Sequence, residues 1–219
     1  MKRTRWSLLC VAAGALSLGG AGQPQPTDTG WRDLFNGRDL TGWASVMGNT
    51  AAWTTRDGEI VSAIPGQGEW LRTDKAFSDF ELTLEIFLPV GANTGVGFRT
   101  AEVGDPAYAG YEIQINDSAG QEPTSSNAGA VFRIAPARVM AIHPGAWNRL
   151  RLRVVGATLD AWLNGERIHA GTRLPRRESD RVRPGGGRRG HIALQDNGGA
   201  ARFRRVRIRP IGGAFTPPR

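Results

Sequence analysis

The chain has 219 residues, among them 30 glycines and 13 prolines, and it carries a formal net charge of +8. Its single cysteine is Cys10, so intramolecular disulfide bonds are excluded as a support for the fold. The stretch 173–189 holds seven arginines but none of the aromatic residues that a nucleic-acid surface interleaves with basic side chains. We therefore predict no nucleic-acid partner, and we interpret this stretch as a solvated surface loop, with contact to an anion or an acidic glycan as the alternative.

Residues 1–22 have the pattern of a signal peptide. Lys2, Arg3 and Arg5 precede an apolar run from Trp6 to Leu18, and small residues follow at 19–22. The run is too short to cross the roughly 30 Å of membrane hydrocarbon, so we predict no stable membrane span. We expect cleavage and a periplasmic or extracellular location, with an uncleaved anchor as the alternative. Removing the three basic residues would lower the formal net charge from +8 to +5.

The rest of the chain is predicted to contain a single domain. Residues 23–30 form a polar, proline-rich linker, 31–211 form the domain, and 212–219 form a disordered tail. About 195 residues remain after cleavage, a length that is common for an undivided all-β domain.

Short segments in which apolar and polar residues alternate run through this domain, while helix signals are nearly absent. From Arg149 to Val155, for example, Leu150, Leu152 and Val154 alternate with arginines. The predicted strands are 52–55, 59–63, 70–73, 80–88, 95–100, 110–116, 130–134, 149–155, 158–163, 191–195 and 201–209. The pattern predicts an all-β fold, an antiparallel β-sandwich.

Polar side chains on these strands are the first candidates for a site. Glu112 and Gln114 alternate with apolar neighbours, and Arg99 ends the preceding strand. We expect these three side chains to converge in a groove on one sheet. A purely structural sheet also has a polar outer face, so alternation alone assigns no function.

Short motifs of the common enzyme classes are missing from the sequence. It has no glycine-rich phosphate loop, no G-x-S-x-G elbow and no histidine-rich metal motif. His143, His169 and His191 are scattered without ligand spacing. We expect His143 and His169 on the surface, and His191 in a buried or capping role.

A series of segments in fixed order matches the pattern of one family. The segments are Leu34–Trp43, Asp57–Val61, Leu71–Lys75, Asp79–Leu82, Asn93–Arg99, Gly104–Tyr108, Tyr111–Ile115, Pro144–Asn148, Trp162–Gly165, Ile192–Gln195 and Arg202–Arg204. Single pieces are weak signals, but the ordered set resembles the bacterial 3-keto-disaccharide hydrolase domain family over residues 30–211. The resemblance implies a concanavalin A-like jelly roll.

Members of that family act on glycosides whose C3 hydroxyl has been oxidised to a ketone. The ketone acidifies the C2 proton, so a base can form an enolate that expels the group at C1, and water can then add. Such a site needs a base, a partner for the enolate oxygen and a proton donor. The resemblance thus implies an enzyme that cleaves 3-keto-glycosides, with a carbohydrate as its partner and its oligomeric state left open, and the signal-peptide pattern predicts that it is exported.

The resemblance places these roles on seven residues. Glu112 is the first candidate for the base or for a metal ligand, Arg99 for the partner of the enolate oxygen, and Asp117 is the third catalytic candidate. No nucleotide or redox cofactor is implied, and a divalent cation is left open. The residues expected to bind substrate are Asn93, Gln114, Gln195 and Asn197.

Two positions depart from the family pattern. Asn197 stands where the family often has histidine, and Phe132 stands where it often has tyrosine. If either residue was the proton donor, this chain uses another group or has lost the activity. The alternative hypothesis is therefore a lectin-like domain that binds carbohydrate on the same fold without chemistry.

Overall fold

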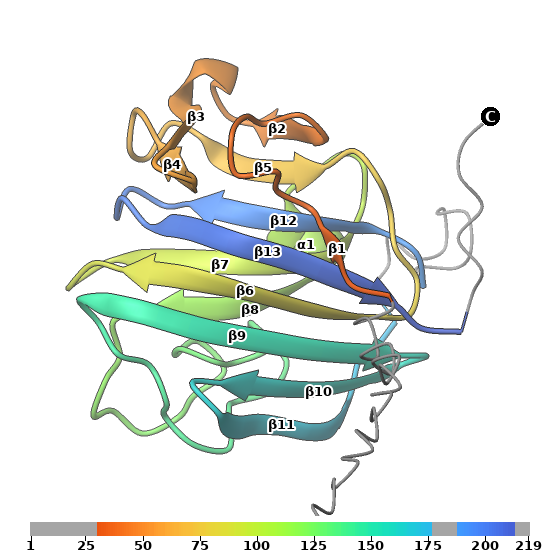
Figure 1. The fold of residues 1–219 in the computed structure, drawn as a ribbon. Coiled ribbons are helices and arrows are strands. Elements are labelled where there is room, and N and C mark those ends of the chain that lie inside the picture. The colour runs from red at the N-terminus through yellow and green to blue at the C-terminus, as the bar shows by residue number, and fades with distance from the viewer. Residues whose placement is uncertain (1–29, 177–187, 213–219) are drawn as a thin grey trace, which may run out of the picture.

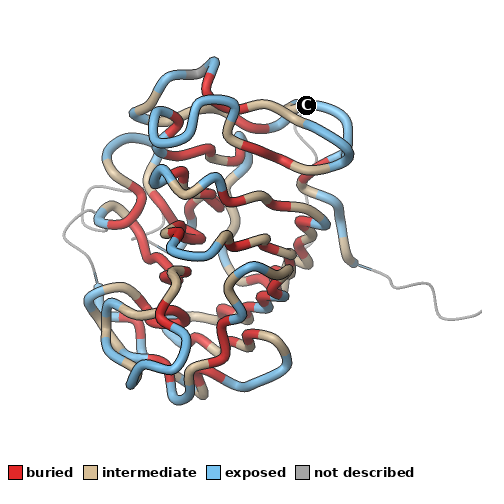
Figure 2. Tube along the Cα trace, turned by 90° about the vertical axis from the view of Figure 1, so that its left-hand side faces the viewer, coloured by how far each residue is buried: buried red, intermediate tan, exposed pale blue. Residues whose placement is uncertain are grey.

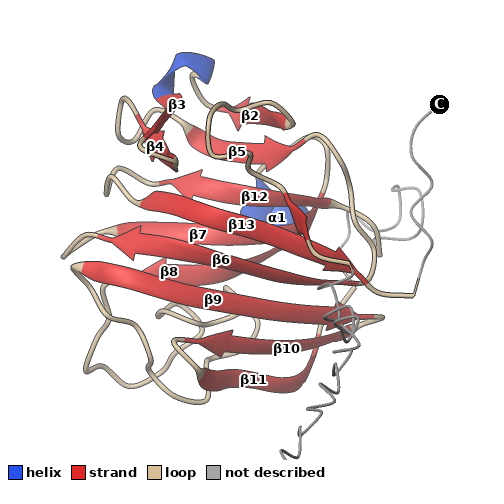
Figure 3. Cartoon of the chain, in the orientation of Figure 1, coloured by secondary structure: helices blue, strands red, loops and turns tan. Residues whose placement is uncertain are grey.

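The computed structural model describes residues 30–176 and 188–212, which form two antiparallel β-sheets packed against each other (Figure 1). The predicted signal peptide, nearly all of the linker, the centre of the arginine-rich loop and the end of the tail lie outside the described residues. Within the described part, helix is limited to the short turns η1 (Thr50–Ala52) and α1 (Pro106–Ala109) (Figure 3). No helix in that part is long and apolar enough to cross a membrane.

The larger sheet has eight strands. In spatial order they are β11 (Glu166–Arg173), β10 (Thr158–Leu163), β9 (Ala146–Val155), β6 (Phe80–Leu88), β13 (Arg202–Pro210), β4 (Glu59–Ser62) and β3 (Trp53–Arg56), and β1 (Arg32–Asp33) also pairs with β13. The smaller sheet has five strands in the order β2 (Trp43–Met47), β5 (Glu69–Thr73), β12 (His191–Asp196), β7 (Asn93–Thr100) and β8 (Tyr111–Asn116). The predicted antiparallel sandwich is confirmed.

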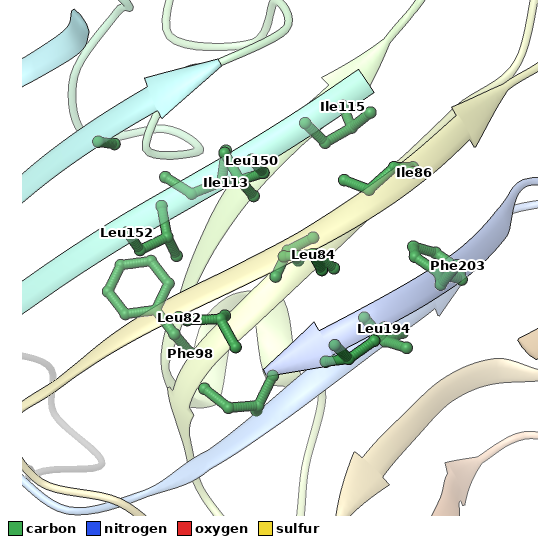
Figure 4. Packing of buried hydrophobic residues seen from close by; sticks show 14 of the residues in the cluster. Leu82, Leu84, Ile86, Phe98, Ile113, Ile115, Leu150, Leu152, Leu194 and Phe203 are labelled. Atoms are coloured by element: carbon green, nitrogen blue, oxygen red, sulfur yellow. The ribbon is translucent and has the colours of Figure 1, made fainter. Parts of the chain in front are cut away.

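The core lies between the two sheets, where every second side chain of the long strands is buried. Leu82, Leu84 and Ile86 from β6 meet Leu150 and Leu152 from β9, and the smaller sheet supplies Phe98, Ile113, Ile115 and Leu194 (Figure 4). The alternation along strands and the exposure of the connecting loops are visible in Figure 2. Burying large apolar side chains in this way is the main source of folding free energy.

Several sequence-based expectations need correction. Residues 130–134 were expected as a strand, but they form turns joined to their surroundings by isolated bridges, from Val131 to Ile113 and to Ala135. The strands β1, β2 and β11 were not predicted. His169 is buried rather than on the surface, and its Nε2 lies 2.8 Å from the carbonyl oxygen of Gly129.

Candidate functional site on the outer face of the five-stranded sheet

The pairing of the five strands sets out two rows of side chains on the face that points away from the core. One row follows the register Ala44, Arg72, Ala193, Gly97 and Glu112 across the sheet. The next row contains Val46, Trp70, Gln195, Gly95 and Gln114. Residues opposite each other in a sheet share a face, so Glu112, Gln114, Gln195, Arg72 and Trp70 lie on one surface.

Gly95 and Gly97 form the floor of this surface because larger residues would collide with the side chains that cross it. A Cβ on Gly95 would lie 1.9 Å from Oε1 of Glu112. A Cβ on Gly97 would lie 3.0 Å from the Cβ of Ala193 and 3.3 Å from Cζ3 of Trp70. The two glycines therefore allow Glu112 to lie against one edge of the floor and the Trp70 indole against the other.

Glu112 has an unusual protonation equilibrium. The residue is only 2% exposed, and burial raises its pKa from 4.5 to about 8, with a smaller contribution from the nearby negative charge of Asp105. With its amide nitrogen turned toward Glu112, Gln114 donates to Oε1 of Glu112 at 3.2 Å and to the Thr94 carbonyl oxygen at 3.1 Å. Near neutral pH the carboxyl group exchanges between its acid and base forms, which suits a proton-transfer residue.

Three polar atoms on this face are buried without a hydrogen-bond partner: Oδ1 of Asn93, Oε1 of Gln195 and Nε of Arg72. Leaving such a group unpaired costs about 1–3 kcal/mol, so folded proteins rarely keep them without a reason. The only other buried, unpaired side-chain atom among the described residues is Oγ of Ser45, which belongs to the core-facing row. The clustering of the other three marks this face as a place where a ligand or water completes the bonding.

Arg72 is held in place by His191 at the end of the neighbouring strand. Nδ1 of His191 lies 2.7 Å from the Thr73 carbonyl oxygen, and Nε2 lies 3.2 Å from Nη1 of Arg72. Nδ1–H therefore donates to Thr73, and Nη1 of Arg72 lies against the ring, 2.9 Å from Nδ1 and 3.2 Å from Nε2. Burial lowers the pKa of His191, and the positive charge of Arg72 adds to that effect, so a neutral ring lies beside the guanidinium.

A short cover lies over the two rows. Ala107 from α1 packs with Trp70 and Ala193, and Phe132 packs against the same cluster. Outside it, Tyr108 is 51% exposed, and Nη1 of Arg133 lies 3.3 Å from its hydroxyl group. The cover packs on Trp70 and Ala193 and presents an aromatic ring at its outer side.

Arg99 does not share this face with Glu112, so the expectation that the two converge is wrong. Arg99 has φ +50° and lies at a register irregularity between β12 and β7, which turns its side chain toward the end of the sandwich. Its guanidinium donates to the carbonyl oxygens of Ser78 and Gly156, and it forms an ion pair with Asp79 at 2.8 Å. These contacts join the two sheets, which is a structural role.

Asp117 and Asn197 lie just beyond strand ends. Oδ2 of Asp117 accepts from the Gly91 backbone N–H at 2.7 Å, which fixes the loop before β7 instead of placing the carboxylate beside Glu112. Asn197 is exposed and follows β12. The remaining substrate-binding candidates Asn93, Gln114 and Gln195 lie on the outer face with Glu112, as the strand register requires.

Sequence reasoning missed Trp70, Arg72 and His191 as members of this surface. Trp70 is buried, but on the outer face of the sheet and not in the core between the two sheets. Asp196 was also missed: its Oδ2 accepts from the Ser62 hydroxyl and from the backbone N–H groups of Gly66 and Gly68, all within 3.0 Å. No group of three or more His, Cys, Asp or Glu side chains suited to a metal ion occurs among residues 30–176 and 188–212.

Comparison with protein families gives one match, to the 3-keto-alpha-glucoside-1,2-lyase-like domain, over residues 30–209. The chain belongs to this family. No curated protein matches it.

Solved structures share the fold of this family member. One, a candidate glycosyl hydrolase from Parabacteroides distasonis ATCC 8503, has 23% identity and a TM-score of 0.67, with 84% of this chain and 94% of that chain covered. A second candidate glycosyl hydrolase from the same organism has 24% identity and a TM-score of 0.65, covering 83% and 99%. The VIP36 exoplasmic/lumenal domain, bound to Ca²⁺ and Man3GlcNAc, has 10% identity and a TM-score of 0.50, covering 83% and 89%. These likenesses establish the jelly-roll fold.

Both departures from the pattern of the 3-keto-alpha-glucoside-1,2-lyase-like family lie at the border of the outer face. Phe132 is partly buried against the cluster of Trp70, Ala107 and Ala193, and its backbone N–H donates to the carbonyl oxygen of Glu112 at 2.9 Å. The phenyl ring supplies no proton. Glu112 is therefore the one carboxyl group on the two rows that can donate or accept a proton near neutral pH.

Proposed function

We propose that the protein cleaves glycosides that carry a ketone at C3, by proton transfer at Glu112. The observation that carries this proposal is the buried Glu112 carboxyl, with its pKa of about 8, on a face where Asn93, Gln195 and Arg72 each keep an unpaired polar atom. Membership of the 3-keto-alpha-glucoside-1,2-lyase-like family supports this class of substrate.

In the proposed reaction, ionised Glu112 takes the proton from C2 of the sugar. The electron pair of that C–H bond forms the C2–C3 double bond of an enolate, and the negative charge moves to the C3 oxygen. When the enolate collapses, the C3 ketone re-forms, a C1–C2 double bond forms and the C1–O bond breaks, and the alcohol departs with the proton that Glu112 took. Addition of water across the C1–C2 bond then returns a proton to C2 and gives the net hydrolysis of the glycoside.

The raised pKa of Glu112 suits this chemistry. A carboxylate whose conjugate acid has a pKa of about 8 is a stronger base than an ordinary one, and a catalytic pKa near the working pH balances strength against the fraction in the correct form. In the same row, Arg72 stands on the other side of Ala193 and Gly97. We assign Arg72, in place of Arg99, to the enolate oxygen, because a guanidinium stays cationic and presents several N–H donors.

Sugar hydroxyl groups would complete the bonding of Oδ1 of Asn93 and Oε1 of Gln195. The Trp70 indole provides an apolar face of the kind on which sugar rings stack. Because these groups are shielded from solvent, the proposal requires the cover around α1 to open when a sugar binds. The exposed ring of Tyr108 is placed to meet the sugar first.

Turnover of a chromogenic 3-keto-glucoside tests the proposal. We expect the wild type to cleave it and to leave the unmodified glucoside intact, because without the ketone the C2 proton is not acidic. Glu112→Gln should lower turnover by at least ~100-fold, whereas Glu166→Gln, which removes an exposed carboxylate on β11, should leave it unchanged. Repeating the assay with a chelator shows whether a divalent cation contributes.

Three results would contradict the proposal in different ways. Normal turnover by folded Glu112→Gln would remove Glu112 from the chemistry. Cleavage of the unmodified glucoside would overturn the enolate mechanism. Sugar binding without turnover of either compound would support the second candidate function, a lectin-like domain, which the three unpaired polar atoms and Trp70 also fit.

An exported location is part of the same proposal and is supported by the composition of residues 1–22. N-terminal sequencing of the protein from a bacterial host should find a start near residues 21–23. Soluble cytoplasmic protein that retains Met1 would refute export.

A further inference from the structure

The outer face of the eight-stranded sheet, opposite the site described above, is covered by arginines. Along most of this face each arginine has an acidic partner. Arg202 pairs with Glu59 at 2.8 Å, Arg204 with Glu85 at 2.7 Å, and Arg167 with Asp160 at 2.6 Å. Each of these three acids contacts two arginines, so the pairs offset part of the positive charge at the ends of the face.

The middle of the face is different because it has an excess of positive charge around a hollow. The hollow has a volume of about 290 Å³. Thr83 on β6 lies between Arg151 on β9 and Arg207 on β13 in the strand register, and its short side chain leaves the space that the longer arginines enclose. The residues around it are Arg149, Arg151, Arg207, Arg209, Glu81, Thr83 and Trp31.

Four guanidinium groups thus surround Glu81, and one of them, that of Arg207, also pairs with Asp33 at 3.2 Å. Glu81 is already shared by Arg151 and Arg209, both at 3.0 Å, and by Arg153 at 3.7 Å. The guanidinium of Arg149 has no ion pair or hydrogen bond with any described residue, and the side chain is exposed. The hollow therefore has unsatisfied positive charge at a place where a small anion fits.

We propose that this hollow is a second carbohydrate site, which binds a single uronate residue of an acidic polysaccharide. A guanidinium matches the planar carboxylate of a uronate with two parallel hydrogen bonds. The guanidinium groups of Arg207 and Arg209 lie over the Trp31 indole, 6.0 Å and 5.2 Å from its centroid, which holds them at the hollow. The Thr83 hydroxyl and the Glu81 carboxylate can bond sugar hydroxyl groups. The volume is at the small end of ligand pockets, which suits one monosaccharide unit.

The arrangement favours a uronate over a nucleic acid or an anionic membrane. A phosphate backbone is bound by a track of cations along the strand, but here the arginines beyond the hollow already have acidic partners in Glu59, Glu85 and Asp160. Glu81 at the edge of the hollow would repel a doubly charged phosphate more strongly than a singly charged carboxylate. The hydroxyl groups of a sugar, in contrast, can donate to that same carboxylate.

Calorimetric titration of the full chain with trigalacturonate tests this inference without any enzyme assay. We expect binding of trigalacturonate and an affinity at least tenfold lower for its methyl ester, which keeps the sugars and removes the charge. Arg149→Gln should weaken trigalacturonate binding about tenfold. Thr83→Leu, which fills the hollow and keeps every charge, should weaken it by at least as much.

Arg56→Gln is the matched control, since Arg56 is an exposed arginine on β3 of the same sheet and lies away from the hollow. This variant should bind trigalacturonate like the wild type. Equal losses in Arg56→Gln and Arg149→Gln would overturn the proposal by showing general charge attraction. Undiminished binding of trigalacturonate by Thr83→Leu, or equal binding of the methyl ester by the wild type, would also overturn the proposal. Competition by inorganic phosphate at the same concentration would do the same. A protein that binds oligonucleotides or anionic vesicles but not trigalacturonate would contradict it as well.

Discussion

Replacing Glu112 by glutamine should change how the stability of the protein depends on pH. The folded protein raises the pKa of Glu112 from 4.5 to about 8 because the carboxyl is buried, with Asp105 adding to the effect. Between these two values the folded chain holds a proton that the unfolded chain releases. The free energy of unfolding must therefore fall as the pH rises through this range, and glutamine, which resembles the protonated acid in shape and never ionises, removes that contribution.

The magnitude follows from the two pKa values. Each unit corresponds to 1.36 kcal/mol, so the change from 4.5 to about 8 sets an upper bound of roughly 5 kcal/mol on the loss. Because the structure can relax around a charged Glu112, we expect about 2–5 kcal/mol. The two proteins should be similarly stable at pH 5, and the glutamine variant should be the more stable by this amount at pH 9.

Urea denaturation of both proteins at pH 5, 7 and 9 measures the difference. Glu85→Gln is the control, because the pKa shift of Glu85 has the opposite sign. Burial alone would raise the pKa of Glu85, but hydrogen bonds from Arg204 and Arg205 outweigh burial, and the pKa is lowered. The stability from Glu85 is present above its unfolded pKa and is lost only as the pH falls through its folded pKa. Between pH 5 and 9 the free energy of unfolding of Glu85→Gln should therefore change with pH in the same way as that of the wild type. Parallel curves for Glu112→Gln would refute a buried, neutral Glu112.

Three further predictions concern other parts of the fold. Arg99→Ala should lower the free energy of unfolding by roughly 2–4 kcal/mol, because Ser78, Gly156 and Asp79 lose their shared donor. Turnover by the folded fraction should stay near normal. An unchanged urea midpoint would argue against a structural role for Arg99. Gly95→Ala should displace Glu112, since the new Cβ would lie 1.9 Å from Oε1; we expect at least a tenfold loss of turnover by folded protein, and wild-type turnover would show that the carboxyl has room. Leu152→Ala should cost about 2–5 kcal/mol in urea denaturation, against less than about 1 kcal/mol for the exposed Arg151→Ala, and the reverse order would mean that β9 is assigned to the wrong face.

The fold could be predicted from the sequence wherever apolar residues strictly alternate. β6, β9 and β10 show such alternation, and their predicted bounds agree closely with the structure. β2 has the sequence WASVM, and β11 contains Gly171 with a shifted register toward β10, so neither carries a regular pattern. Residues 130–134 contain β-forming side chains, but the chain turns back at Arg133, which has φ +58°.

In the candidate site, too, prediction from the sequence succeeds where the strands pair regularly and fails where the register shifts. Glu112, Gln114 and Gln195 lie in unbroken register, and their common face follows from counting residues in twos. Arg99 follows the same count from Gly97, but its left-handed backbone conformation shifts the strand by one position. A bulge of this kind reverses which residues face which side, and nothing in the local residue types reveals it.

Asp196 and Asn197 show how this chain can change at its site without losing its fold. The Asp196 carboxylate holds Ser62, Gly66 and Gly68, whereas the Asn197 side chain, next along the chain, is exposed and bonds to no described residue. Mutations at position 197 are therefore nearly free of selection on folding. A substitution at position 197 removes no contact that the fold uses, whereas a substitution at position 196 would release the loop that the carboxylate anchors.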